Sequence, residues 1–173
     1  MTLAPNGEVP WDESLSYLRR AHEINPSDSS VLACLGYCEV VAGNLKQGNE
    51  QLQNVRRLNP NDPWTVHLHN ALAVAALHVR DYDGAVHWAK QAIQDAPGFP
   101  QPRSTLARAY VGLGQLDQAK AALESVRRIA PELLEAQLEG RFIGRGAEVR
   151  QRYITFIRIA AGLEDPSAAD ALR

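Results

Sequence analysis

Two cysteines and five histidines are the residues of this chain whose types best suit metal binding or nucleophilic chemistry. Cys34 and Cys38 stand four residues apart in a helical pattern, where a disulfide between them would distort the helix. A metal ion would need further ligands, and the chain has no other cysteine. The sequence therefore predicts small buried thiols in a reducing compartment.

The histidines are not spaced as metal ligands. His67 and His69 are two residues apart and point in different directions on a helix, while His67 and His78 lie three turns apart. Neither pair has the i, i+4 spacing with which two histidines clamp zinc. The sequence also has no nucleophile elbow, phosphate-binding loop or HExxH motif. We therefore expect no catalytic residue, no metal and no cofactor, and we predict that the chain is not an enzyme.

Arginines gather in doublets and near the C-terminus. Arg56-Arg57 and Arg127-Arg128 each occupy the final turn of a helical pattern, where positive charge offsets the negative end of the helix dipole. The segment Gly140–Ala161 holds five arginines and one glutamate, a net charge of +4, which could contact nucleic acid or an acidic protein surface. No aromatic residues interleave with them on one face, so a solvated cap is the favoured interpretation.

Length and composition limit the class of protein. The 173 residues are 45% hydrophobic and carry a formal charge of −2, which suits an ordinary globular domain and does not suit a general nucleic-acid binder. No apolar run approaches the roughly 18 residues that cross a bilayer, and Met1–Pro10 lacks the features of a signal peptide. We expect no membrane association and a cytoplasmic location.

Four prolines mark a repeat along the chain. Pro26, Pro60, Pro97 and Pro131 each follow a helical pattern, at spacings of 34, 37 and 34 residues. Such a period suits two helices and two turns. Aligned on the prolines, small residues fall at two equivalent positions, where one helix must cross its partner closely: Gly36, Ala73 and Ala107 at the first, and Gly48, Ala85 and Ala119 at the second.

A third equivalent position holds the residue that ends each first helix. Gly43 and Gly114 suit the left-handed conformation that commonly ends a helix, because glycine adopts it without steric cost. Arg80 occupies the same position in the middle repeat. The sequence therefore predicts a turn of different geometry at Arg80.

Three stretches resemble successive tetratricopeptide repeat motifs, over roughly Ser29 to Pro131: LGYCEVVAGNLKQGNEQLQNVRRLNP, ALAVAALHVRDYDGAVHWAKQAIQDAP and LARAYVGLGQLDQAKAALESVRRIAP. The resemblance implies an all-α fold, a right-handed superhelix of antiparallel helix pairs. About three full repeats are expected, with a partial N-terminal repeat and a C-terminal capping helix. In that cap, Tyr153 and Phe156 lie on the apolar face, and Arg150, Arg152 and Arg158 are expected on the solvated face.

This interpretation makes residues 1–173 a single domain. The expected parts are a half repeat at 11–27, repeats at 29–62, at 63–99 with a three-residue insertion and at 100–133, an irregular repeat with its capping helix at 134–162, and a frayed tail at 163–173. The chain starts in the middle of a repeat, which favours a piece of a longer protein.

A second resemblance concerns residues 91–134, the arginine-bearing helix after them and AGLEDP. These look like the C-terminal repeat region of bacterial multidomain signalling proteins, which include class III adenylate cyclases and winged-helix regulators. In such proteins the catalytic or DNA-binding domain lies upstream, and the repeats sense or assemble. The resemblance implies regulatory interaction and carries over no catalytic residue.

In tetratricopeptide arrays the first helices of successive repeats line a concave groove. The positions that face it here include Tyr37, Val41, His67, Asn70, Val74, His78, Gln101, Ser104 and Arg108. The resemblance implies a non-catalytic module that binds a peptide or helix of a partner protein, or of an upstream domain of the same protein. Two alternatives stay open. One is a nucleic-acid-associated regulator that uses the basic C-terminal segment, and the other is a self-association scaffold that dimerises through Trp11, Leu15 and Leu18 of an uncapped first helix.

The basic segment gives the first testable prediction. If its arginines are a solvated cap, the chain should show no detectable binding to random duplex DNA near physiological salt, measured by fluorescence anisotropy. Dedicated non-specific binders reach about 10⁻⁴–10⁻⁶ M under these conditions. Micromolar binding that weakens steeply with added salt would contradict this prediction and favour the nucleic-acid alternative.

Overall fold

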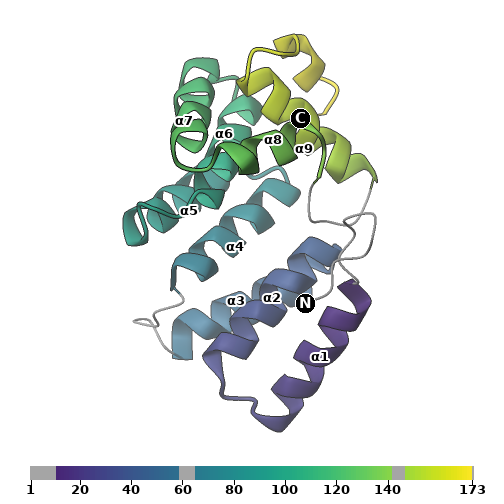
Figure 1. Cartoon of the computed structure of the whole chain (residues 1–173). Coiled ribbons are helices and arrows are strands. Elements are labelled where there is room, and N and C mark those ends of the chain that lie inside the picture. Colours follow the sequence, from purple (N-terminus) through teal and green to yellow (C-terminus); the bar gives the residue numbers. More distant parts are fainter. Residues whose placement is uncertain (1–10, 59–64, 142–146, 173) are drawn as a thin grey trace.

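The structure is a computed structural model, and it describes residues 11–58, 65–141 and 147–172. Within these residues the chain is all-α, as predicted, and Figure 1 shows the helices stacked in chain order with α1 and α9 at opposite ends. The helices are α1 (Trp11–Ile24), α2 (Ser29–Ala42), α3 (Leu45–Leu58), α4 (Thr65–His78), α5 (Tyr82–Asp95), α6 (Gln101–Gly112), α7 (Leu116–Ile129), α8 (Pro131–Leu138) and α9 (Ala147–Ala160), followed by the short 3-10 helix η1 (Pro166–Ala169).

Helices α4 and α6 form the centre of the stack. Helix α4 packs against α2, α3, α5 and α6, and its residues from Asn70 to Leu77 are all buried. In α6 the buried run extends from Ser104 to Gly112. A helix with apolar residues on every side is stable only when other elements surround it, which explains why these two helices occupy the interior.

The second helix of each pair is amphipathic and covers the centre from one side. In α5 the buried face includes Ala85, Ala89 and Ala92, whereas Asp83 and His87 are exposed. In α7 the buried face consists of Ala119, Ala122, Leu123 and Val126. These residues recur three or four positions apart, so each of these helices buries a single stripe.

Small residues lie where the paired helices cross, as the sequence predicted. A methyl group added to Gly48 would come within 2.7 Å of the Gly36 carbonyl oxygen and 2.8 Å of the Val40 nitrogen, both of them backbone atoms. Ala73, Ala85, Ala107 and Ala119 occupy the equivalent positions of the other two pairs and are fully buried. Small buried residues therefore lie at the equivalent positions of all three pairs, as a close crossing of helices requires.

The prediction of a different turn at Arg80 was wrong. Arg80 has φ 63°, which is left-handed like Gly43 at 93° and Gly114 at 73°. The same pair of backbone hydrogen bonds closes each turn, and at Arg80 these run from its own N–H to Leu77 and from the Asp81 N–H to Ala76. The helix-ending hydrogen bonds thus impose one geometry on all three turns, whatever residue stands there.

The C-terminal segment differs from two predictions. Arg152 is only 4% exposed and donates to the backbone carbonyls of Leu77 at 3.3 Å and His78 at 3.1 Å, so it does not lie on the solvated face of α9. The tail is also ordered through residue 172, because Asp165 caps η1 and Ala169 is fully buried. The core of the capping helix is as predicted, with Tyr153 and Phe156 buried.

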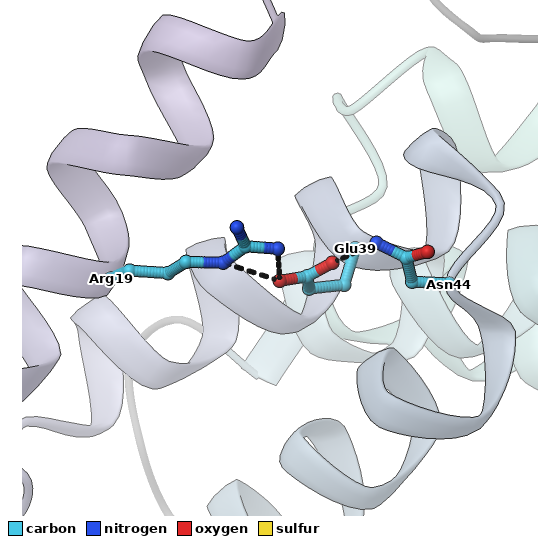
Figure 2. Close-up of polar contacts among 3 residues, drawn as sticks. All are labelled: Arg19, Glu39 and Asn44. Carbon is cyan, nitrogen blue, oxygen red and sulfur yellow. Dashed lines mark hydrogen bonds and ion pairs between the residues drawn. The ribbon is translucent and has the colours of Figure 1, made fainter.

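The first helix is docked against the rest of the chain. Leu15 of α1 is buried, although the side chain of Trp11 lies outside the described residues. Figure 2 shows Arg19 of α1 reaching across to Glu39 of α2, with both Nε and a terminal nitrogen bonded to one carboxylate oxygen at 3.1 and 2.8 Å. Asn44 donates to the other oxygen. Burial of Leu15 takes away one of the three apolar residues on which dimerisation through an uncovered first helix was predicted, and Leu18 is half-buried.

Replacing Arg80 tests the cost of its left-handed backbone. Arg80→Gly should raise the free energy of unfolding by up to about 1 kcal/mol, because glycine adopts this conformation without steric cost. Urea unfolding measures the change. Arg80→Gly also removes the exposed Arg80–Glu148 ion pair. The same substitution in a Glu148→Gln background, where that pair is already absent, measures the effect of the backbone alone. A destabilised Arg80→Gly variant in that background would contradict the proposed strain.

The Arg19–Glu39 pair gives a second stability prediction. The Glu39 side chain is 0% exposed, so Arg19→Met should leave a buried carboxylate with too few partners and cost about 1–3 kcal/mol. Adding Glu39→Leu should recover part of that loss, and a double-mutant cycle by urea unfolding measures the coupling. The exposed pair Arg127 and Glu124 is the matched control, with an expected coupling below about 1 kcal/mol. Additive losses at Arg19 and Glu39 would show that the pair does not hold α1 to α2.

Candidate interaction groove

Two pockets lie side by side on the face formed by α2, α4 and α6. The first, which we name the aromatic pocket, has a volume of about 280 Å³. Its lining is Ala33, Cys34, Tyr37, His67, Asn70, Phe99 and Gln101. The His67 and Phe99 rings meet edge to face with their centroids 5.1 Å apart, so aromatic groups from α4 and from the segment just before α6 form one wall.

The second pocket, named here the arginine pocket, is smaller, at about 130 Å³. It is lined by Tyr37, Asn70, Val74, His78, Gln101, Thr105, Arg108, Leu133, Gln137, Arg141 and Tyr153. Tyr37, Asn70 and Gln101 belong to both linings, so the two pockets form one continuous groove.

Most of the residues predicted to face the groove line these pockets. Seven of the nine do so: Tyr37, His67, Asn70, Val74, His78, Gln101 and Arg108. Ser104 of α6 is fully buried in the interior of the helical stack, so it lines neither pocket. The side chain of Val41 lies outside the described residues.

Arg108 is the buried cation of the arginine pocket. Its Nε donates to the Ser104 carbonyl at 3.2 Å, and its guanidinium lies 4.7 Å from the centroid of the Tyr153 ring. Burial lowers the pKa of Arg108 from its usual range, partly opposed by Tyr153 and Tyr37. The ordinary pKa of arginine is so high that the group still carries its charge at neutral pH.

His78 lies beside this cation as a neutral ring. Its Nδ1 is 3.0 Å from the Val74 carbonyl oxygen and 2.8 Å from the Tyr153 hydroxyl. Because a carbonyl only accepts, the first contact places the proton on Nδ1. Burial lowers the pKa of His78, the hydrogen bond to the Val74 carbonyl partly opposes this, and the positive charges of Arg152 and Arg108 lower the pKa further. The side chain therefore offers an unprotonated Nε2 at neutral pH.

Three buried polar atoms of the groove lack a hydrogen-bond partner within the described residues. They are Asn70 Oδ1, His78 Nε2 and Gln137 Oε1. Asn70 and Gln137 are each only 6% exposed. Buried polar groups without partners cost free energy, so native proteins leave few of them, and groups of this kind commonly mark places where water or a ligand binds.

The two thiols are less buried than the sequence predicted. Cys34 is exposed and lines the aromatic pocket, and Cys38 is half-buried, whereas the sequence predicted two buried thiols. Burial is the largest cause that raises the pKa of Cys38, to about 11, and the neighbouring Cys34 and Glu39 raise it further. Burial, followed by the charge of Asp28, also raises the pKa of Cys34. Both groups are therefore protonated at neutral pH and are poor nucleophiles and poor metal ligands.

The sequence missed the groove residues that come from outside the first helices. Phe99 precedes α6, Gln137 belongs to α8, Arg141 follows α8, and Tyr153 belongs to α9. The repeat alignment assigns groove positions only within first helices. The apolar spacing of α9 identified Tyr153 as a buried residue, but it did not show that α9 packs against α6 and reaches the groove.

Most of the basic C-terminal segment is engaged within the chain. Arg141 pairs with Glu139 at 2.7 Å, Arg158 pairs with Glu164 at 4.0 Å, and Arg152 is buried. Arg150 of α9 is exposed. The contacts of the other three arginines favour the solvated cap over a nucleic-acid surface.

Comparison with known proteins supports the architecture. A sequence model of the tetratricopeptide repeat family matches residues 76–138. A crystal structure of MamA superposes with a TM-score of 0.60 at 18% identity, covering 94% of this chain and 92% of that one. MamA from AMB-1 gives a TM-score of 0.59 at 20% identity, covering 94% of this chain and 89% of that one. The fold is a right-handed tetratricopeptide repeat solenoid.

A third similar structure is residues 41 to the end of MamA from Desulfovibrio magneticus RS-1. Its TM-score is 0.61 at 18% identity, with 92% of this chain and 80% of that chain covered. Similarity at this level of identity concerns the fold alone. Separately, no helix among the described residues combines the length and apolar character needed to cross a membrane.

Proposed function

We propose that this chain is a non-catalytic protein-interaction module whose groove binds a peptide or helix of a partner protein. The observation that carries the proposal is the continuous pair of pockets on α2, α4 and α6, with Asn70 at their junction. Tetratricopeptide solenoids present extended concave surfaces of this kind for binding.

The size of the groove favours a polypeptide over a small metabolite. Pockets for small ligands typically occupy about 300–1,000 Å³ and enclose most of the ligand. The pockets here have volumes of about 280 and 130 Å³, and they share the lining residues Tyr37, Asn70 and Gln101. Two small, connected pockets fit successive side chains of one segment better than a single compact molecule.

The unpaired acceptors also suit a polypeptide. Asn70 Oδ1, Gln137 Oε1 and His78 Nε2 are buried and have no hydrogen-bond partner among residues 11–58, 65–141 and 147–172. A peptide backbone supplies one N–H donor at every residue other than proline. An extended segment in the groove would satisfy these atoms while its side chains fill the pockets.

The wider setting belongs to the same proposal. The resemblance of residues 91–134 to the repeat regions of bacterial signalling proteins favours a regulatory or assembly role in a larger cytoplasmic signalling protein. The partner would be another protein or an upstream domain of the same protein. The division into repeats at 29–62, 63–99 and 100–133 is part of this interpretation, and the expected insertion at the start of the second lies outside the described residues.

A peptide-display selection followed by pocket-filling variants tests the proposal. Peptides selected on the wild-type chain should bind Cys34→Trp at least about tenfold more weakly, because an indole at this exposed position fills the aromatic pocket. Fluorescence anisotropy measures the affinity, and thermal unfolding checks that the variant is folded. Lys120→Trp adds the same group to an exposed position of α7 that lines neither pocket, and it should bind like wild type. Equal affinities for all three proteins would reject the groove.

A further inference from the structure

We infer that α1 is a docking site for an amphipathic helix of a partner polypeptide, which crosses α1 closely at a glycine or an alanine. The surface that this helix would cover, named here the crossing face, consists of Tyr17, Leu18 and Ala21. None of these residues lines the aromatic pocket or the arginine pocket. The inference therefore concerns a second surface and does not depend on the proposed function.

The repeat alignment places α1 as a second helix, equivalent to α3, α5 and α7. Each of those three helices packs against the first helix of its own pair, which is α2, α4 or α6. Within the described residues no first helix accompanies α1, which lies at one end of the stack and packs against α2 (Figure 1). Aligned on the four prolines, the equivalents of Leu18 are Leu52, Ala89 and Leu123, and those of Ala21 are Val55, Ala92 and Val126.

The crossing face is accessible where its equivalents are buried. The six equivalents of Leu18 and Ala21 are at most 2% exposed, whereas Leu18 and Ala21 themselves are only half-buried. Tyr17 is 67% exposed, and its equivalents are half-buried or buried: Gln51, Trp88 and Ala122. Helix α1 thus has the residue types of a covered second helix without the cover that the three complete pairs provide.

The pair of α2 and α3 shows what the occupant needs. A methyl group added to Gly36 of α2 would come within 2.9 Å of the Leu52 side chain of α3, so this leucine lies directly against the small residue. Leu18 is a leucine at the same position as Leu52. A helix that crosses α1 in the same way therefore needs glycine or alanine against Leu18. Its opposite side would face solvent, so the occupant is amphipathic, unlike α4 and α6.

The crossing face is held in place before any partner binds. Leu15 is buried, and Arg19 is bonded to Glu39 of α2, whose side chain is 0% exposed. Tyr17 is two residues from both Leu15 and Arg19, which is about 200° around a helix, so it points away from α2. A surface that is already ordered loses less entropy on binding, which favours docking of a partner helix.

Charged residues at the rim of the crossing face give the occupant a direction. Glu13 and Arg20 are exposed and lie four residues before and three residues after Tyr17, on the same side of α1. The Tyr17 hydroxyl donates to Glu13 at 3.2 Å, which places this carboxylate beside the ring. Because the two helices of a pair run antiparallel, the occupant should carry an acidic residue near its start, against Arg20, and a basic residue near its end, against Glu13.

The test uses a display library of helix-forming peptides of about 20 residues, a length that supports a helix in water. Selection runs in parallel on the wild-type chain and on Ala21→Arg, which blocks the crossing face, and sequencing identifies the peptides enriched only on the wild type. These peptides should carry a central glycine or alanine with large apolar residues three or four positions away. Acidic residues should precede that centre and basic residues should follow it.

Protein variants assign the binding to the crossing face. Tyr17→Arg should weaken binding of a selected peptide by about tenfold or more, measured by fluorescence anisotropy. Ser16→Arg is the matched control, because it adds the same side chain at an exposed position of α1 outside the crossing face, and it should bind like wild type. Tyr17 is exposed, so its replacement leaves the fold intact, and thermal unfolding checks this.

A change in the peptide tests the close crossing itself. Replacing the central glycine or alanine by leucine should weaken binding by about tenfold or more, because a large side chain there would meet Leu18. A merely sticky apolar surface would bind the leucine peptide as tightly as the parent or more tightly. That result would overturn the inference.

Three other results would also overturn it. They are a selection that enriches no peptide on the wild type, equal affinities for Tyr17→Arg and Ser16→Arg, and a wild-type chain that self-associates in sedimentation while Tyr17→Arg stays monomeric. The last result would assign the crossing face to a second copy of this chain. Helices bound at the crossing face should bind Cys34→Trp like wild type, because Cys34 belongs to the aromatic pocket. Failure of this inference is thereby distinguished from failure of the proposed groove.

Discussion

The close crossing of two helices at small residues is the constraint on which this solenoid depends. At Gly48 the backbones of α2 and α3 approach so closely that one added methyl group would meet main-chain atoms of α2 below 3 Å, and at Gly36 it would meet the Gly48 carbonyl oxygen at 3.1 Å. Main-chain atoms cannot rotate away as a flexible side chain does, so larger residues would force the two helices apart. The same crossing, with alanines, recurs between α4 and α5 and between α6 and α7. It fixes the shape of each pair and so sets how the first helices align along the groove.

The C-terminal cap also contributes to the lining of the groove. Arg152 of α9 donates to the last carbonyls of α4, which lie 75 and 74 residues earlier in the chain, and these carbonyls carry the negative end of the helix dipole. Tyr153 beside it contacts His78 and stacks on Arg108. A helix that covers the end of the repeat core therefore also completes the arginine pocket. The proposed binding face therefore depends on the same packing of α9 against α4 and α6 that covers the core.

Features that repeat along the chain were predictable from the sequence, and features formed once were not. The helical class, the small residues at the crossings and seven groove positions follow from the alignment of equivalent positions, since each repeat confirms the others. Arg80 was misjudged because helix-ending hydrogen bonds impose a left-handed residue even where glycine is absent. Arg152 was misjudged because its partners belong to a distant helix, and a helical pattern alone does not show which polar residue will find buried acceptors. Gln137 of α8 and Tyr153 of α9 were missed for the same reason, because the packing that brings them to the groove does not repeat along the chain.

Amide chemical-shift mapping by NMR, with a peptide selected on the wild-type chain, tests the central claim most directly. A segment bound along α2, α4 and α6 and against the cap should give the largest shifts at residues 33–37, 67–78, 99–108 and 137–141, with little change in the exposed faces of α3, α5 and α7. Largest shifts on those outer helices or on α1, with the groove residues unchanged, would contradict it.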